Sequence, residues 1–307
     1  MILAVCANPS VDSFWSIEEI QKATINRSAE ESFYPGGKGI HVAFALRELG
    51  QRVSTLGVWG GMTGQWLKQQ CQENDITACG PEVEGWTRIC ITNKSTTNWD
   101  ETEFLGAGPT LTDNQANSFV SAYEHQLKQQ AQEAVVISGS SPDGFSDDIY
   151  YQLITKAQSF DIPTFIDASG NLLTKALEAE PYAVHINCDE GHELTGYNNP
   201  EKMTRWLTKY CTLAAVTAGA DGLYMTHQDK LYHAKYSIDN SNIISTIGSG
   251  DCLFAGLCKA NLTFEDPRQW ARLATACGSA NCIYPKLGML DKADVDMIFD
   301  QVTIKVL

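Results

Sequence analysis

The sequence is short of positive charge, and this shortage argues against several classes of partner. Its 22 Lys and Arg residues face 37 Asp and Glu residues, which gives a formal net charge of −15. Proteins that bind nucleic acids carry basic patches, and this sequence has no cluster of Lys and Arg. An acidic surface is also repelled by anionic membranes. We therefore expect neither a nucleic acid nor a membrane as a partner.

Paired cysteines and long apolar runs are also missing. The ten cysteines form no C-x-x-C pair, and most lie in apolar segments, where free cysteine behaves as a small hydrophobic residue. No apolar run approaches the roughly 20 residues that a membrane-spanning helix needs. No basic segment precedes the first apolar run, so no signal peptide is expected. These absences favour a reduced, cytoplasmic enzyme.

Two common nucleotide-binding fingerprints are absent, but two other glycine-rich turns are present. The sequence has no G-x-x-x-x-G-K-[ST] motif, and G-x-G-x-x-G is missing from the first strand–helix turn. Glycine-rich turns at 36–39 and 248–251 each precede an apolar helical pattern. Glycine amides at a helix N-terminus form an anion site. Asp251 would lie beside one, as a base for an attacking hydroxyl or merely as a helix cap.

Short apolar strands alternate with helical patterns along much of the sequence, and most of these strands end in small, polar or acidic residues. This alternation is typical of an α/β fold with a mostly parallel sheet and helices on both faces. Ligands bind at the carboxyl ends of such strands. One expected helix covers 118–132, and another covers 146–159 with Ser146 as its N-cap. Strands are expected at 2–7, 53–58, 134–138, 164–166, 183–186 and 213–217.

Other short strands do not follow this alternation. They are expected near 14–15, 31–34, 87–92 and 102–105, and the last two would pair as a hairpin. We expect them to form a small flap over the main sheet, drawn from about 13–35 and 86–106. Since the sequence has no linker or internal repeat, it predicts a single domain spanning 1–307.

Five polar side chains are candidates for binding, each with a plainer alternative. Asp12 follows the first strand and could hold sugar hydroxyls, or be a solvated loop carboxylate. Arg88 suits phosphate, although strand arginines are usually surface residues. His41 could contact a ligand or be an ordinary half-buried helix residue. Asn187 and Glu190 lie three residues apart at a strand end, where they could bind Mg²⁺ partly through water or form a capping box.

Taken together, these motifs resemble the PfkB (ribokinase-like) family of carbohydrate kinases over nearly the whole length. The turn at 36–39 is similar to the family's first glycine signature, and 248–251 is similar to the second. Residues 187–190 resemble its N-x-x-E element. The likeness is strongest to the branch of 1-phosphofructokinase, tagatose-6-phosphate kinase and the minor 6-phosphofructokinase. The segments that carry this are 8–12, 26–27, 87–91, 102–109, 138–140 and 186–187.

The resemblance implies a ribokinase-like three-layer α/β/α sandwich with a small β lid, which often mediates dimerisation. It implies ATP-dependent phosphorylation of a ketohexose phosphate, fructose 1-phosphate or tagatose 6-phosphate, to a bisphosphate. Asp251 would be the catalytic base, and the amides of Gly248, Ser249 and Gly250 would stabilise the transferred phosphoryl group. The implied substrate-binding residues are Asp12, Gly37, Lys38, His41, Arg88 and Ser140. The implied ATP- and Mg²⁺-binding residues are Asn187, Glu190, Thr217, Gly219, Gly222 and Asn281, with Mg²⁺ held through water near Asn187 and Glu190.

Two other functions remain open at this point. One is a kinase of an unphosphorylated sugar or nucleoside, but such a substrate would give Lys38 and Arg88 no anion to hold. The other is a catalytically silent sugar-phosphate sensor, which would not need Asp251, Asn187 and Glu190. An assay of ADP release with phosphorylated and unphosphorylated sugars distinguishes all three.

The sequence departs from the family pattern mainly where the sugar is recognised. His41 stands where the branch usually has Asn in Gly-Gly-Lys-Gly-x-Asn. Cys90 and Thr92 replace the Asn and Lys frequent in 1-phosphofructokinases, and a Cys there is more like tagatose-6-phosphate kinases. His185 replaces a lysine, and Thr217 replaces the Ser of the nucleotide turn. The resemblance therefore implies an intact catalytic set with an altered sugar-binding set.

Overall fold

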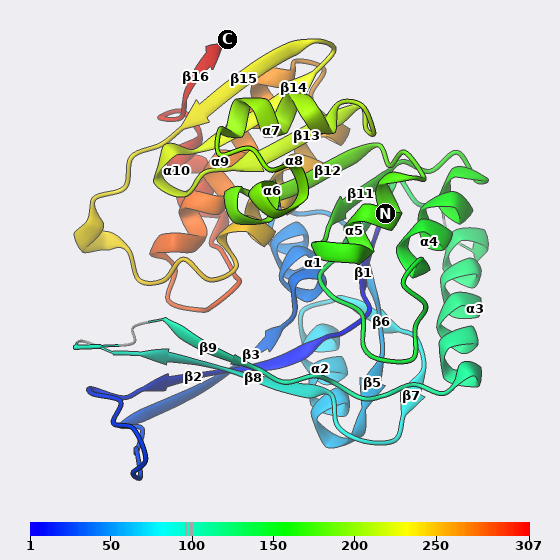
Figure 1. Cartoon of the computed structure of the whole chain (residues 1–307), viewed down its shortest axis with the longest axis vertical. Coiled ribbons are helices and arrows are strands. Elements are labelled where there is room, and N and C mark those ends of the chain that lie inside the picture. The colour runs from blue at the N-terminus through cyan, green and yellow to red at the C-terminus, as the bar shows by residue number, and fades with distance from the viewer. Residues whose placement is uncertain (96, 99–100, 130) are drawn as a thin grey trace.

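A mostly parallel sheet runs through the centre of the computed structural model, which describes residues 1–95, 97–98, 101–129 and 131–307 (Figure 1). Its strands follow the order β16-β15-β14-β13-β12-β11-β10-β1-β4-β6. Pairing is parallel from β13 to β6 and antiparallel from β13 to β16. The strands are β1 (Ile2–Cys6), β4 (Val53–Gly57), β6 (Thr77–Cys79), β10 (Ala134–Ser138), β11 (Thr164–Asp167), β12 (Ala183–Asn187), β13 (Leu213–Thr217), β14 (Leu223–His227), β15 (Lys230–Lys235) and β16 (Thr303–Val306).

Helices cover both faces of this sheet (Figure 1), because its parallel strands are apolar on both sides. In β1, Ile2 and Ala4 pack into one apolar cluster while Leu3 and Val5 pack into the other, as the two-residue period of a strand requires. The helices packed into the first cluster are α1 (Lys38–Glu48), α2 (Gly61–Glu73), α8 (Ser249–Thr263), α9 (Pro267–Ile283) and α10 (Lys292–Phe299). Those packed into the second are α3 (Asp113–Gln129), α4 (Ile149–Gln158), α5 (Gly170–Leu177), α6 (Cys188–Thr195) and α7 (Pro200–Leu207).

A smaller sheet projects from one end of the main body (Figure 1). Its order is β3-β2-β8-β9, with β2 and β8 parallel and the outer pairs antiparallel. This sheet, called the lid below, consists of β2 (Ser10–Ser16), β3 (Glu30–Gly36), β8 (Arg88–Lys94) and β9 (Thr102–Leu105). Two further short strands, β5 (Trp59–Gly60) and β7 (Glu82–Val83), pair with each other. Within the expected lid segment 86–106, residues 96, 99 and 100 lie outside the described residues.

The predicted fold class is confirmed, while two expected helix boundaries differ. The helix expected at 118–132 begins five residues earlier, at Asp113, and residue 130 lies outside the described residues. The helix expected to be capped by Ser146 begins at Ile149, with Asp148 as its N-cap. Ser146 precedes a separate turn, in which the Ile149 amide donates to the Ser146 carbonyl. The single-domain assignment to 1–307 stays a prediction.

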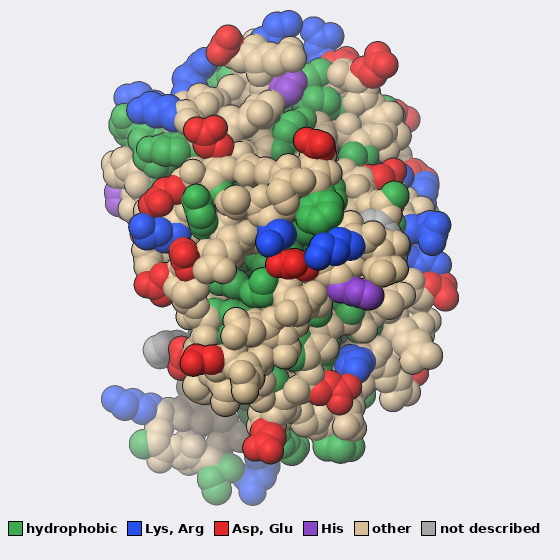
Figure 2. Space-filling model, turned by 90° about the vertical axis from the view of Figure 1, so that its right-hand side faces the viewer, with side chains coloured by type: hydrophobic (Ala, Val, Ile, Leu, Met, Phe, Trp, Pro, Cys, Tyr) green, Lys and Arg blue, Asp and Glu red, His purple; other side chains and the backbone are tan. Residues whose placement is uncertain are grey.

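The charged side chains can be followed on one face of the molecule. Figure 2 shows acidic and basic side chains interspersed over one face of the molecule. Among the described residues, no helix combines the length and apolarity needed to cross a bilayer. A cytoplasmic location stays a prediction.

Candidate active site

A cleft of about 1030 Å³ opens where the lid meets the carboxyl ends of the parallel strands. Loops after β1, β10, β11, β12 and β13 reach it, as does the N-terminus of α8. Every sequence-predicted site residue except Asn281 lines this cleft. Asn281 is instead buried in α9, where its amide nitrogen donates to the Met289 carbonyl oxygen at 2.7 Å. The cleft therefore unites residues that lie more than 200 positions apart in the sequence.

Two helix N-termini in the cleft wall have no side-chain cap. Gly37 precedes α1 with a φ of 91°, and Gly248 precedes α8 with a φ of 79°. A Cβ on Gly248 would lie 2.4 Å from the Cα of Gly288, so conformation and close packing both require glycine there. Uncapped first-turn amides, with the positive end of the helix dipole, favour an anion. Both predicted glycine-rich turns therefore have the geometry of anion sites.

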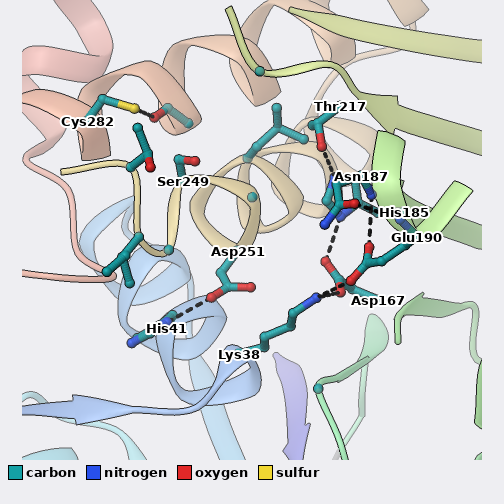
Figure 3. Close-up of a pocket in the computed structure, with 18 of the residues that line it drawn as sticks. Lys38, His41, Asp167, His185, Asn187, Glu190, Thr217, Ser249, Asp251 and Cys282 are labelled. Atoms are coloured by element: carbon teal, nitrogen blue, oxygen red, sulfur yellow. Dashed lines mark hydrogen bonds and ion pairs between the residues drawn. The ribbon is translucent and has the colours of Figure 1, made fainter. Parts of the chain in front are cut away.

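Asp251 lies in the first turn of α8 and points into the cleft (Figure 3). It does not cap its helix, because the N-cap is Gly248 and no side chain bonds there. Its Oδ2 lies 2.8 Å from Nδ1 of His41. Burial raises the pKa of Asp251, and the hydrogen bond and charge of His41 only partly offset that effect. The alternative that Asp251 is merely a helix cap is wrong.

His41 lies between Asp251 and Asp12, and its side chain is 5% exposed. Its Nε2 is 3.2 Å from Oδ2 of Asp12. Burial alone would lower the pKa of His41, but hydrogen bonds and charge from both carboxylates outweigh it and raise the pKa to about 10. Burial would raise the pKa of Asp12, yet His41 and the hydroxyl of Ser10 lower it overall. Asp12 is therefore not the solvated loop carboxylate of its plainer alternative, and His41 is fully buried rather than half-buried.

Lys38 reaches away from this group toward the ends of β11 and β12 (Figure 3). Its Nζ is 2.7 Å from Asp167 and 3.2 Å from Glu190. Asp167 also bonds Nδ1 of His185 at 2.6 Å, and Nε2 of His185 lies 3.3 Å from the hydroxyl of Thr217. Burial would raise the pKa of Asp167, but the charges of Lys38 and His185 lower it well below its usual range. Asp167 was not singled out from the sequence, where the only signal was an acidic residue ending a buried strand.

Asn187 and Glu190 form the capping box that the sequence offered as an alternative. Asn187 Oδ1 accepts the Glu190 amide hydrogen, and Glu190 Oε2 accepts that of Asn187, both at 2.9 Å. Glu190 Oε1 pairs with Lys38, so this carboxylate is already in use. Among the described residues, no three His, Cys, Asp or Glu side chains converge as a metal cage. Amide and carboxylate oxygens are ligand types that Mg²⁺ accepts, and a Mg²⁺ site held through water near this pair stays a prediction.

Arg88 is the first residue of β8 and lines the cleft. Its Nε donates to the Asn8 carbonyl at 3.2 Å, and Nη1 donates to the Gly106 carbonyl at 3.4 Å. The side-chain amide nitrogen of Asn8 also donates to the hydroxyl of Ser140 at 3.4 Å, so Ser140 lies beside the loop that anchors Arg88. Arg88 is therefore an anchored cleft residue and not the surface arginine of the plainer alternative.

A family model and solved structures both relate this chain to carbohydrate kinases. The family model for pfkB family carbohydrate kinases matches residues 7–289. A "possible 1-phosphofructokinase" of Thermotoga maritima superimposes with a TM-score of 0.87, at 26% identity, over 100% of this chain and 99% of that chain. Phosphofructokinase-2 of Escherichia coli in complex with potassium gives a TM-score of 0.87 at 23% identity, over 98% of each chain. Its tetrameric inhibited form gives the same four values.

At these identities the Escherichia coli structures bear on the fold alone, and the family match covers most of the chain. It includes the turn that carries Lys38, the Asn187–Glu190 element and the turn that carries Asp251. The chain belongs to the pfkB family of carbohydrate kinases, phosphotransferases whose acceptor is an alcohol group.

Proposed function

We propose that this chain transfers the γ-phosphate of ATP to a ketohexose phosphate, fructose 1-phosphate or tagatose 6-phosphate, and so produces a bisphosphate. The observation that carries the proposal is the presence of Arg88 and Lys38 in the same cleft as the buried carboxylate of Asp251. An unphosphorylated sugar would leave Arg88 without an anion. The likeness to a protein named as a possible 1-phosphofructokinase supports the same substrate class.

In this reaction the chain's own groups move one proton and hold developing charge. Asp251 accepts the proton of the sugar hydroxyl as its oxygen attacks the γ-phosphorus and the bond to ADP breaks. A carboxylate whose pKa is raised by burial is a stronger base than an exposed one, which suits this task. The amides of Gly248, Ser249 and Gly250 hold the charge of the transferred group. Catalysis of this kind depends mainly on positioning and charge stabilisation.

The other side of the cleft would hold ATP and Mg²⁺. Thr217, Gly219 and Gly222 line it there, close to the capping box of Asn187 and Glu190. Asn187 and Glu190 would hold Mg²⁺ through water, and the ion would neutralise part of the negative charge of the ATP phosphates. Lys38 pairs with Glu190 of that box, so its ammonium group would contact phosphate of both substrates, while Arg88 and Ser140 would contact the sugar phosphate alone.

We also infer a homodimer joined through the lid. Phe33, Ile89 and Phe104 are exposed on the lid strands, and exposed apolar groups of this kind mark interaction sites. A second copy of the chain would present the same apolar row and cover it symmetrically.

An ADP-release assay tests the substrate. The panel is fructose 1-phosphate, fructose 6-phosphate, tagatose 6-phosphate, fructose and ribose. We expect the highest kcat/KM with a ketohexose phosphate. Efficient turnover of fructose or ribose alone would overturn the proposal in favour of a kinase for neutral sugars. Binding of a sugar phosphate in calorimetry without ADP release would instead indicate a sensor.

Asp251→Asn tests the base in the same assay. The amide cannot accept the proton, so kcat should fall by roughly 10²–10⁴-fold while the KM values change little. Asp113→Asn, in the exposed first turn of α3, is the matched control and should leave kcat unchanged. Near-normal turnover in Asp251→Asn would remove the role of base from this residue.

A further inference from the structure

His41 connects two carboxylates that belong to different layers of the molecule. Its Nδ1 lies 2.8 Å from Asp251 on α8, and its Nε2 lies 3.2 Å from Asp12 on β2 of the lid. Figure 3 shows the imidazole bonded to one oxygen of Asp251, while the other oxygen points elsewhere. Among the described residues, Oδ1 of Asp251 has no hydrogen-bond partner. We call Asp12, His41 and Asp251 the His41 bridge.

Close packing against two glycines holds the bridge in place. A Cβ on Gly288 would lie 2.1 Å from Cδ2 of His41, so the ring rests directly on that backbone. A Cβ on Gly36 would lie 2.0 Å from Cγ of Asp12, so this carboxyl group is packed in the same way. Neither side chain can shift far without meeting backbone. The bridge therefore fixes the distance between the carboxylates of Asp12 and Asp251.

The charges in the bridge depend on one another. With both nitrogens protonated, Nδ1 of His41 donates to Asp251, Nε2 faces Asp12 at 3.2 Å as a charge contact without hydrogen-bond geometry, and the positive charge of the ring offsets one of the two negative charges. Without it, two buried carboxylates would face the same small space, which would favour protonation of one of them. The other charged groups that face the bridge are Glu103 on β9, Arg88 on β8, Lys38 on α1 and Asp167 on β11.

We propose that His41 is a positioning residue that ties the sugar-binding Asp12 to the base Asp251 and so determines which sugar hydroxyl reaches the base. This inference rests on the proposed kinase function. A hydroxyl held by Asp12 is placed at a fixed distance from Oδ1 of Asp251, and a hydroxyl at another carbon of the sugar is not. The neutral and shorter amide of Asn at position 41 would supply neither the charge nor contacts to both carboxylates.

The test uses His41→Asn and His41→Gln in the full chain, with the exposed His125→Asn as matched control. Loss of the cation raises the pKa of Asp251, so the acid limb of the kcat/KM profile should move to higher pH. We expect kcat/KM to fall roughly tenfold or more at pH 6 and less at pH 9, since the base is deprotonated again at high pH. A purely structural role would lower activity equally at both pH values.

A double-mutant cycle tests the link to the sugar. Asp12→Asn should cost less in kcat/KM in the His41→Asn background than in the wild type, because the bridge is already broken. The differences in kcat/KM among the ketohexose phosphates should also become smaller in His41→Asn. Additive effects, together with an unshifted acid limb, would overturn the proposal.

A measurement without turnover separates this inference from the proposed function. In ¹⁵N NMR, the His41 ring should stay protonated above pH 8 in the wild type and titrate at lower pH in Asp251→Asn. If no sugar is phosphorylated, the proposed function fails, and the NMR titration still decides whether the bridge exists. A His41 that titrates near the ordinary pKa of about 6.5 in both proteins would overturn it. Where His41→Asn does not fold, His41→Gln and the two aspartate variants still provide the readouts.

Discussion

At the scale of single residues, Arg88 is the side chain on which the substrate class depends most directly. Two of its nitrogens are occupied by the carbonyl oxygens of Asn8 and Gly106. Among the described residues, its Nη2 has no hydrogen-bond partner. The guanidinium group is therefore anchored on one side and open on the other, an arrangement suited to a phosphate of the substrate.

Arg88→Ala should raise the KM for the sugar phosphate by about 10–100-fold, the usual effect of losing a charge-assisted hydrogen bond. The KM for ATP should stay close to the wild-type value, because the hydrogen bonds of Arg88 anchor it to Asn8 and Gly106 and not to the capping box. Arg88→Lys should recover little, since an ammonium group cannot reproduce the anchored fork. Steady-state kinetics with Arg205→Ala, on the exposed side of α7, as control would check this. An unchanged KM in Arg88→Ala would remove Arg88 from the phosphate site.

Asp167 is a second residue whose importance is visible only in three dimensions. Its side chain is 2% exposed and touches both Lys38 and His185. Removing one partner of a buried ion pair leaves the others uncompensated and typically costs about 3–5 kcal/mol. Lys38 is 37% exposed and keeps Glu190, so solvent reduces that penalty here.

Asp167→Asn should therefore lower the free energy of unfolding by about 2–3 kcal/mol. Asp296→Asn, which breaks an exposed pair with Lys292, should lower it by less than about 1 kcal/mol. Because the pKa of Asp167 is lowered in the folded chain, its contribution is complete above the unfolded pKa of about 4 and is lost as the pH falls below that value. Urea unfolding at pH 7 and pH 3 measures both effects. Equal losses in the two variants at pH 7 would contradict the role of the buried network.

At the scale of elements, periodicity and composition predict most of what is seen. The strand expected at 134–138 agrees in every residue with β10, and the glycine-rich turns open α1 and α8. Local signals decide these features, since strand burial and glycine geometry are written in neighbouring residues. The start of α4 could not be predicted in the same way, because Ser146 and Asp148 are both good N-cap residue types.

Contacts between distant elements could not be predicted from the sequence. His41 and Asp251 are separated by 210 positions, and nothing near either one indicates the other. The approach of Gly288 to Gly248 and to His41 likewise depends on how the loop after α9 passes over two helix N-termini. Gly288 reads as an ordinary loop glycine in the sequence. In the structure, Gly288 contacts both the glycine-rich turn at 248–251 and the ring of His41.

Gly288→Ala tests this crossing, with Gly50→Ala as its matched control. Both glycines have positive φ, 66° and 77°, so alanine costs about 1–2 kcal/mol at either position. A Cβ on Gly50 meets nothing within 4 Å, whereas one on Gly288 meets the His41 ring. We expect a clearly larger loss of unfolding free energy in Gly288→Ala, and a partial recovery when His41 is also changed to Ser. Equal losses at the two glycines would show that the His41 ring can move away from an added methyl group and is not held rigidly against Gly288.

At the scale of the whole molecule, the two faces of the lid differ in what they meet. Asp12 pairs with Cys90 in register, and both side chains line the cleft. The next row, which points the other way because strand side chains alternate, runs from Phe33 through Ser13 and Ile91 to Phe104. Phe33 is 53% exposed and Phe104 58% exposed at the two ends of that row. A lid that closes one wall of the active site thus carries on its back a row that is apolar except at the buried Ser13.

A homodimer that buries this row would also stabilise the positions of Asp12 and Arg88 in the cleft, because both residues lie on strands that contribute to the row. We expect the wild type to sediment at twice its 33.7 kDa mass and the double variant Phe33→Glu, Phe104→Glu to sediment as a monomer, since charges cannot be buried face to face without partners. Met297→Glu, at an equally exposed apolar residue on α10, is the matched control and should remain dimeric. In the monomer, the KM for the sugar phosphate should rise more than the KM for ATP, because the lid carries Asp12 and Arg88, the residues proposed to hold the sugar. A wild-type monomer at micromolar concentration, or a dimer that persists in the double variant, would place the interface elsewhere.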